Sequence, residues 1–199
     1  MRYRPFGATG KAVSAVSLLM RETPNMTTPQ AWRALAFSAM ESGINSFEVT
    51  AGLDVMALGV GEALRAVERR LIFLSWRLRG DPHRPLTADA VANSVKSGLQ
   101  KTGAGYFDLL MLDDAAYESL EPEAHGYIAD LRAAGLVLQL GVTGEGAATQ
   151  ACIATGDFDV LATPFISVAA WAYPRVVPPS NVDRIMAVFL FTMFSLLPG

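Results

Sequence analysis

The sequence has little of what several common functions require. Its 199 residues include one cysteine, Cys152, and two histidines, too few for a disulfide framework or a cysteine-based metal site. Charged residues make up 18% of the chain, and the net charge of -3 comes without a basic cluster along the sequence. Neither histidine has a recognisable serine or cysteine partner. The sequence therefore argues against nucleic-acid binding and against a hydrolase triad.

No signal peptide or membrane-spanning stretch is recognisable. Residues 1–5 carry charge and are not followed by the apolar segment of a signal peptide, so a cytoplasmic location is expected. The longest apolar run, residues 185–197, has thirteen residues, whereas a spanning helix needs about 20. A buried parallel strand is the favoured interpretation of this run, and a membrane-associated tail is the alternative.

Hydrophobic residues, by contrast, are abundant. They make up 51% of the chain, and the mean hydropathy is +0.29. This composition predicts a single domain over residues 1–199 with a substantial core. It also predicts that some apolar surface meets another surface rather than water.

Strand-like and helix-like segments alternate, which predicts an α/β chain with a parallel sheet. The recurrence of strands every 20 to 35 residues favours a barrel-type repeat, and a doubly wound sheet is the alternative. Residues 2–4 and 12–14 are expected to form a hairpin before the first barrel strand. Strands are expected at 15–19, 44–47, 71–76, 107–112, 137–142, 158–161 and 188–191, and helices at 29–42, 54–68, 88–101, 122–134 and 147–155.

Several local features indicate helix boundaries. Thr28 and Thr87 are typical N-caps, Asp54 is a third candidate, and glycines follow most of the expected helices. The Gly-Val-Gly segment at 59–61 lies inside an expected helix, so it does not indicate a phosphate-binding loop, which requires a preceding strand. Cys152 is expected to be a small buried apolar residue. His83 and His125 are expected on the surface.

Four segments together resemble the aldo-keto reductase family, over about residues 2–197. The most informative reads Gly43-Ile44-Asn45-Ser46-Phe47-Glu48-Val49-Thr50-Ala51-Gly52-Leu53-Asp54 and is followed by Gly61-Glu62-Ala63-Leu64. The other three lie at 6–14, 106–112 and 131–142. The resemblance implies a (β/α)₈ barrel that reduces carbonyls with NADPH. For this chain it implies an incomplete or modified barrel of about seven strands with an N-terminal β-hairpin.

The chain departs from the family at the catalytic positions. The family uses an Asp, a Tyr, a Lys and a His on the loops after successive strands, and its Tyr protonates the carbonyl oxygen. The matching positions here are Glu48, Leu53, Arg77 and Asp113. A leucine has no proton to donate, and neither Tyr106 nor Tyr117 is an obvious substitute. No catalytic residue is therefore expected.

The cofactor positions depart as well. Thr143 and Gly144 replace the Ser-Asn pair that contacts the nicotinamide amide, Ala162 replaces a Gln, and Phe194 matches the ring-stacking aromatic. The eighth strand and its basic segment, which hold the 2′-phosphate, are expected to be missing because the sequence stops at Gly199. Neither NADPH nor a metal is therefore expected to bind.

Glu48 and Arg77 keep the charges of the Asp and Lys that they replace. The favoured interpretation is a structural ion pair near the strand ends, with Asp113 as a further member. The alternative is a polar pocket for a small ligand, with Arg77 as an anion clamp and Asp113 and Asp114 on its rim.

These features lead to one functional hypothesis and two alternatives. The hypothesis is an inactive aldo-keto-reductase-like protein that serves as an accessory subunit, in a homo-oligomer or a larger, membrane-associated complex. The alternatives are a divergent NADPH-dependent carbonyl oxidoreductase and a small-ligand sensor at the barrel mouth. The candidate interaction residues are Trp171, Tyr173, Phe189, Phe191 and Phe194.

Overall fold

The computed structural model describes residues 1–144, 146–164 and 187–191. Its main element is a seven-stranded parallel sheet whose strands follow one another in chain order. A doubly wound sheet would reverse its strand order part-way, so the barrel-type prediction is the correct one. The strands are β3 (Leu18–Met20), β4 (Ser46–Thr50), β5 (Phe73–Leu78), β6 (Phe107–Asp113), β7 (Val137–Thr143), β8 (Val160–Pro164) and β9 (Ala187–Phe191).

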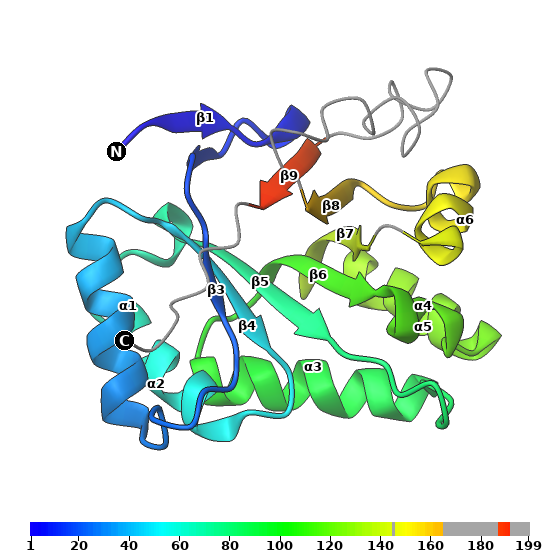
Figure 1. The fold of residues 1–199 in the computed structure, drawn as a ribbon, viewed down its shortest axis with the longest axis horizontal. Coiled ribbons are helices and arrows are strands. Elements are labelled where there is room, and N and C mark those ends of the chain that lie inside the picture. The colour runs from blue at the N-terminus through cyan, green and yellow to red at the C-terminus, as the bar shows by residue number, and fades with distance from the viewer. Residues whose placement is uncertain (145, 165–186, 192–199) are drawn as a thin grey trace.

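The helices cover one face of the curved sheet, and an N-terminal hairpin lies on its other side (Figure 1). The hairpin pairs β1 (Tyr3–Pro5) with β2 (Ala12–Ser14), as predicted. No helix among the described residues is long and apolar enough to cross a membrane. The helices are α1 (Pro29–Glu41), α2 (Asp54–Leu64), α3 (Ala88–Thr102), α4 (Asp114–Glu118), α5 (Pro122–Ala133) and α6 (Ala147–Thr155), with 3₁₀ turns η1 (Gly7–Thr9) and η2 (Arg69–Leu71).

Successive side chains along the strands point to opposite faces of the sheet, and they form two separate hydrophobic cores. On the helix side, Trp76 of β5 stacks against Phe107 with ring centroids 5.1 Å apart and belongs to the main core cluster. On the inner side, Phe73 of β5 contacts Phe6 of the hairpin at 4.5 Å between ring centroids. The hairpin therefore covers the inner face at the end where the strands begin.

Most helix ends lie where the capping residues in the sequence predicted them. Thr28 accepts a hydrogen bond from the Ala31 N–H at 3.3 Å, and Thr87 accepts one from the Ala90 N–H at 3.1 Å, as the capping prediction required. Gly103 and Gly156 cap α3 and α6 in the left-handed conformation. These caps set where the helices begin and end.

Some boundaries were predicted wrongly. Strand β3 begins at residue 18 rather than 15, the second helix ends at Leu64 rather than near residue 68, and α4 was not predicted. Within the apolar C-terminal run, residues 187–191 form a strand parallel to β8, which agrees with the strand interpretation. The rest of that run lies outside the described residues.

Candidate functional site

Polar side chains gather where β4 to β7 end. Parallel strands bring their carboxyl ends to one edge of a sheet, and the pairing sets Thr50 beside Arg77 and Asp113 beside Thr143. Glu48 lies two residues before the end of β4, on the same inner face. The sequence prediction therefore named residues that do converge at this edge.

Glu48 and Arg77 form the predicted ion pair. Arg77 Nη1 lies 3.1 Å from Glu48 Oε1, and the two side chains are 15% and 7% exposed, respectively. Burial raises the pKa of Glu48, although the positive charges of Arg77 and Arg21 oppose the rise. Arg21, just after β3, was not predicted as a site residue; only its position one residue past a strand could have pointed to it.

A small cavity lies beside this pair on the inner face. It has room for about one water molecule, with a volume of about 10 Å³, and it is lined by Glu48, Ser17, Ser46 and Ser75 among others. The hydroxyl oxygen of Ser75 is buried without a hydrogen-bond partner. The cavity is too small for a carbonyl substrate.

Asp113 has a local role and is not a member of the ion pair. Its Oδ1 accepts hydrogen bonds from the N–H groups of Ala116, at 2.8 Å, and Gly80, at 3.1 Å. It therefore caps α4 and fixes the loop after β5 against that helix. The prediction that Asp113 joins the ion pair was wrong, because its carboxylate accepts hydrogen bonds from backbone N–H groups, including an otherwise unpaired one at the start of α4.

Asp114 is turned toward the segment after β7. It accepts a hydrogen bond from the Thr149 hydroxyl at 2.5 Å, and its carboxylate would overlap any side chain added at Gly144. The Gly144 N–H in turn donates to the Ala162 carbonyl at 3.2 Å. Neither Gly144 nor Ala162 has a polar side chain, so at these two positions the edge offers backbone groups only.

Leu53 begins α2 from the N-cap position and makes no capping hydrogen bond. Its half-buried side chain packs against the main core. Asp54, which the sequence suggested as the cap, instead pairs with Lys101 at 2.5 Å. The loop after β4 therefore carries an aliphatic side chain at position 53.

Other potentially reactive groups have ordinary surroundings. Burial raises the pKa of Cys152 to about 12, so its thiol is protonated and unreactive at neutral pH. His83 and His125 are both exposed, as predicted, and His125 meets the ring of Tyr117 edge-on. Within the described ranges, no group of three His, Cys, Asp or Glu side chains could hold a metal ion.

Comparison with protein families shows which family the chain is related to. The sequence model of the Aldo/keto reductase family matches residues 38–170, more than half of the chain. The chain belongs to the aldo/keto reductase family. Among curated proteins, none matches its sequence closely enough to count as a relative.

Solved aldo-keto reductases share the fold. Tm1743, a thermostable enzyme solved with the inhibitor epalrestat, is 19% identical with a TM-score of 0.64, over 83% of this chain and 63% of that one. The holo form of AKR11C1 from Bacillus halodurans is 15% identical with a TM-score of 0.69, over 94% and 65%. This chain therefore spans less than two thirds of either structure, and the likeness shows the fold, an incomplete aldo-keto reductase barrel with its N-terminal hairpin.

The assignment of Glu48 and Arg77 to the family's Asp and Lys positions, and of Leu53 to its tyrosine position, rests on the sequence resemblance and stays a prediction. Phe194, Trp171 and Tyr173 lie outside the described residues, and only the backbone of Phe189 and Phe191 is described, in β9. The interaction assigned to those aromatics stays a prediction.

Replacing Glu48 by glutamine should alter how stability depends on pH. Because burial raises the pKa of Glu48 above its ordinary value of 4.5, the folded chain keeps this proton where the unfolded chain has lost it. The resulting stabilisation is complete below about pH 4.5 and is lost as pH rises through the folded-state pKa. Urea unfolding between pH 4 and 8 should show this fall in the parent chain and not in Glu48→Gln.

Glu62→Gln is the matched control, because Glu62 is partly exposed and lies 4.0 Å from Arg33. It should leave the pH profile unchanged. Parallel profiles for Glu48→Gln and the parent chain would show that the buried carboxyl keeps an ordinary pKa.

Proposed function

We propose that this chain is a non-catalytic member of the aldo-keto reductase family that acts as an accessory subunit by binding a protein partner. The observation that carries the proposal is Leu53, an aliphatic side chain at the position where the family places its proton donor. Without a titratable group in hydrogen-bond reach of the carbonyl oxygen, a hydride acceptor gains no proton from the protein.

Neither Tyr106 nor Tyr117 replaces the missing donor. Tyr106 lies before β6, at the opposite end of the strands, where the Arg69 guanidinium stacks 4.1 Å from its ring centroid. Tyr117 of α4 packs edge-on against Phe158, and burial raises its pKa. A raised pKa opposes the role that the family gives its tyrosine, whose pKa is lowered by a neighbouring lysine.

The surroundings of the nicotinamide position also favour a non-catalytic role. The Asp114 carboxylate packs against Gly144, and Ala162 has no polar side-chain atom, so these two positions lack the side-chain amides that hold the cofactor in the family. Arg77 is already paired with Glu48 beside a cavity that has room for about one water molecule. This pairing gives the sensor hypothesis less support than a structural role for the pair.

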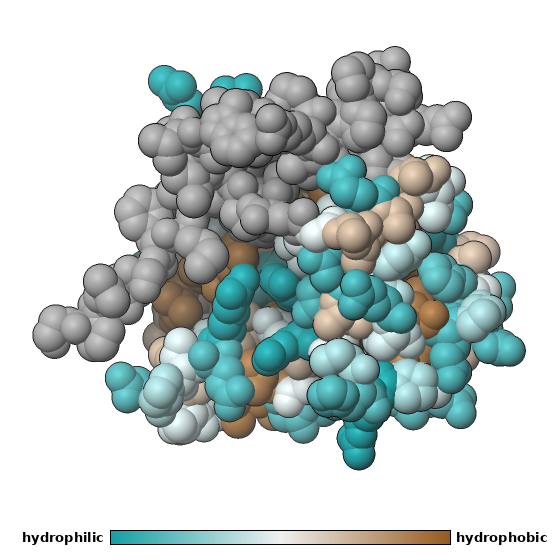
Figure 2. Space-filling view, turned by 45° about the vertical axis from the view of Figure 1, so that its right-hand side comes forward, coloured by the Kyte–Doolittle hydropathy of each residue, from teal (hydrophilic) through white to brown (hydrophobic). Residues whose placement is uncertain are grey.

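Surface composition supports a protein partner. Over the helices shown in Figure 2, hydrophilic residues predominate and hydrophobic ones form only scattered patches. Among the described residues, large hydrophobic side chains are exposed at Met1, Tyr3, Val16, Leu35, Leu58, Leu71, Leu136 and Leu138. Six of these eight lie in the hairpin, in the link that follows it, or where β5 and β7 begin, so the apolar surface is concentrated at that end.

The test is an NADPH titration of the folded chain, followed by tryptophan and nicotinamide fluorescence, together with an aldehyde-reduction assay. We expect no saturable binding in the micromolar range and no NADPH oxidation above the blank, while an active family member assayed in parallel shows both. Turnover would overturn the proposal in favour of a divergent oxidoreductase. Tight binding without turnover would favour the sensor.

A further inference from the structure

A groove of about 550 Å³ lies at the end of the sheet where the strands begin, away from the Glu48–Arg77 edge. It runs between the hairpin, the turn that joins α1 to β4, and the link that joins α2 to β5. Its apolar walls include Met40, Ile44, Val67 and Leu71. Grooves of this size, with apolar walls and a few polar groups, are typical of binding sites.

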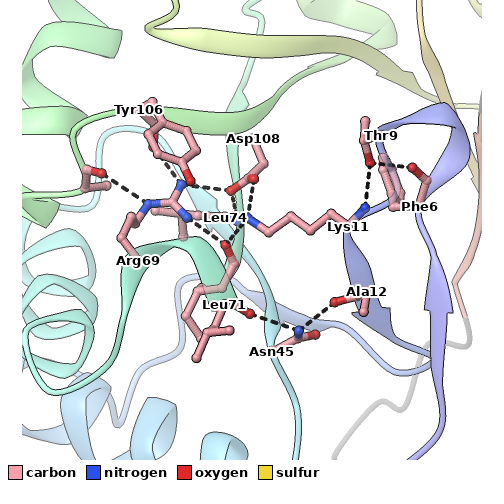
Figure 3. Close-up of polar contacts among 12 residues, drawn as sticks. Phe6, Thr9, Lys11, Ala12, Asn45, Arg69, Leu71, Leu74, Tyr106 and Asp108 are labelled. Carbon is pink, nitrogen blue, oxygen red and sulfur yellow. Dashed lines mark hydrogen bonds and ion pairs between the residues drawn. The ribbon is translucent and has the colours of Figure 1, made fainter.

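Hydrogen bonds between these three segments hold the groove open (Figure 3). The side-chain amide of Asn45 donates to the Ala12 carbonyl at 2.9 Å and to the Leu71 carbonyl at 3.0 Å. The Tyr3 hydroxyl donates to the Gly43 carbonyl at 2.7 Å. The walls are therefore preorganised, which reduces the entropy that a bound segment would have to offset.

The groove lies at a basic end of a chain that is acidic overall. Residues 1–12 and 65–72 together contain six cationic residues and one acid, Glu68. Two further acids belong to this end, Asp108, which is buried and paired with Lys11 and Arg69, and Glu41 at the end of α1. In the segments around the groove, cations thus exceed acids by three, whereas the whole chain has a net charge of -3.

Exposed residues at the rim of the groove combine positive charge with apolar surface. Arg70 is 79% exposed, and its contact with Glu68, which is 62% exposed, is a surface pair that holds it weakly. Leu71, next to it in the chain, is 53% exposed, and Tyr3 across the groove is 50% exposed. The groove therefore offers cations and apolar contact side by side.

We propose that this groove binds an acidic peptide segment of a partner protein, with a carboxylate toward Arg70 and an aliphatic or aromatic side chain against Leu71 and Ile44. Charge complementarity selects the acidic segment, and the apolar walls supply a pocket for its anchor. A bilayer would need a protruding apolar face instead of a groove. Single-stranded nucleic acid would need several aromatic platforms, whereas Tyr3 is the one aromatic among the residues that line the groove.

This inference rests on the part of the proposed function that gives the chain a protein partner, and it is tested without NADPH. A library of random twelve-residue peptides, displayed on phage, would be selected on the folded parent chain and counter-selected on Arg70→Glu/Leu71→Asp. Both positions are exposed, so the double variant should fold. We expect the enriched peptides to contain two or more Asp or Glu together with Leu, Ile, Met or Phe.

Synthetic copies of the enriched peptides would then be titrated by fluorescence anisotropy. We expect Arg70→Glu to weaken binding about tenfold or more, and added salt to weaken it as well. Arg84→Glu is the matched control, because Arg84 is exposed in the loop after β5 and should leave the affinity unchanged.

Three results would overturn the proposal. The first is a selection that yields no peptide distinguishing the parent chain from the double variant. The second is enrichment of peptides without acidic residues. The third is Arg70-dependent binding of phosphatidylserine vesicles or a dT₁₂ oligonucleotide in the absence of any peptide binding. NADPH binding or turnover would overturn the non-catalytic assignment and leave the peptide result as it stands, so the two failures are distinguishable.

Discussion

Replacing Asp108 by asparagine should lower the free energy of unfolding by about 3 to 5 kcal/mol, because two partly buried cations would lose their buried counter-ion. Asp108 is 3% exposed and accepts from Lys11 Nζ at 2.5 Å and from Arg69 Nη2 at 2.8 Å. It also accepts from the Leu74 N–H at 2.9 Å. Burial already lowers the pKa of Lys11, and the negative charge of Asp108 opposes that shift. The measurement is urea unfolding at pH 7.

Asp54→Asn provides a control of matched chemistry. Asp54 pairs with Lys101 at the same 2.5 Å, but its side chain is 65% exposed. Solvent screens such a pair, so its loss should cost no more than about 1 kcal/mol. Equal losses in the two variants would show that burial is not what makes the Asp108 contacts strong.

The Asp108 contacts also show where the sequence stops being informative. Lys11 and Asp108 are 97 residues apart, and nothing local in either segment indicates that they meet. The excess of cations at this end of the barrel is equally invisible along the chain, because it joins the hairpin to a link more than fifty residues away. Contacts of this kind depend on how the whole sheet curves, so only the structure provides them.

Local chemistry, in contrast, predicted the order of the elements well. Threonine caps and left-handed glycines mark α1, α3 and α6 in the sequence as they do in the structure. Strand limits were less exact because an apolar run does not say which of its residues pair. Helix α4 was missed because its five residues are too few to show a helical period.

The candidate site divides in the same way. The Glu48–Arg77 pair could be predicted, because the resemblance to the aldo-keto reductases implies that these two residues keep the opposite charges of the Asp and Lys that they replace. The role of Asp113 could not, because the helix it caps was not expected. The prediction of the site was therefore correct for the ion pair and wrong for Asp113, whose role depends on a helix that was not predicted.

The Gly-Val-Gly segment of α2 leads to the last prediction. The sequence placed it inside a helix, and the structure explains both glycines by packing. A Cβ at Gly59 would overlap the Pro29 carbonyl oxygen and lie 2.6 Å from the Trp32 Cβ of α1, and one at Gly61 would lie 2.5 Å from the Lys101 carbonyl oxygen of α3. The two glycines therefore let α2 approach a helix on each side.

Gly59→Ala should lower the free energy of unfolding by about 1 to 3 kcal/mol, because overlap with backbone atoms outweighs the gain in helix propensity. Gly126→Ala is the matched control, since Gly126 also lies within a helix, α5, and a Cβ there would meet no atom within 4 Å. It should raise the free energy of unfolding by about 0.5 to 1 kcal/mol. Thermal and urea unfolding would measure both variants. A stabilising Gly59→Ala would mean that α1 and α2 can move apart at little cost, and close packing could then no longer explain the glycine.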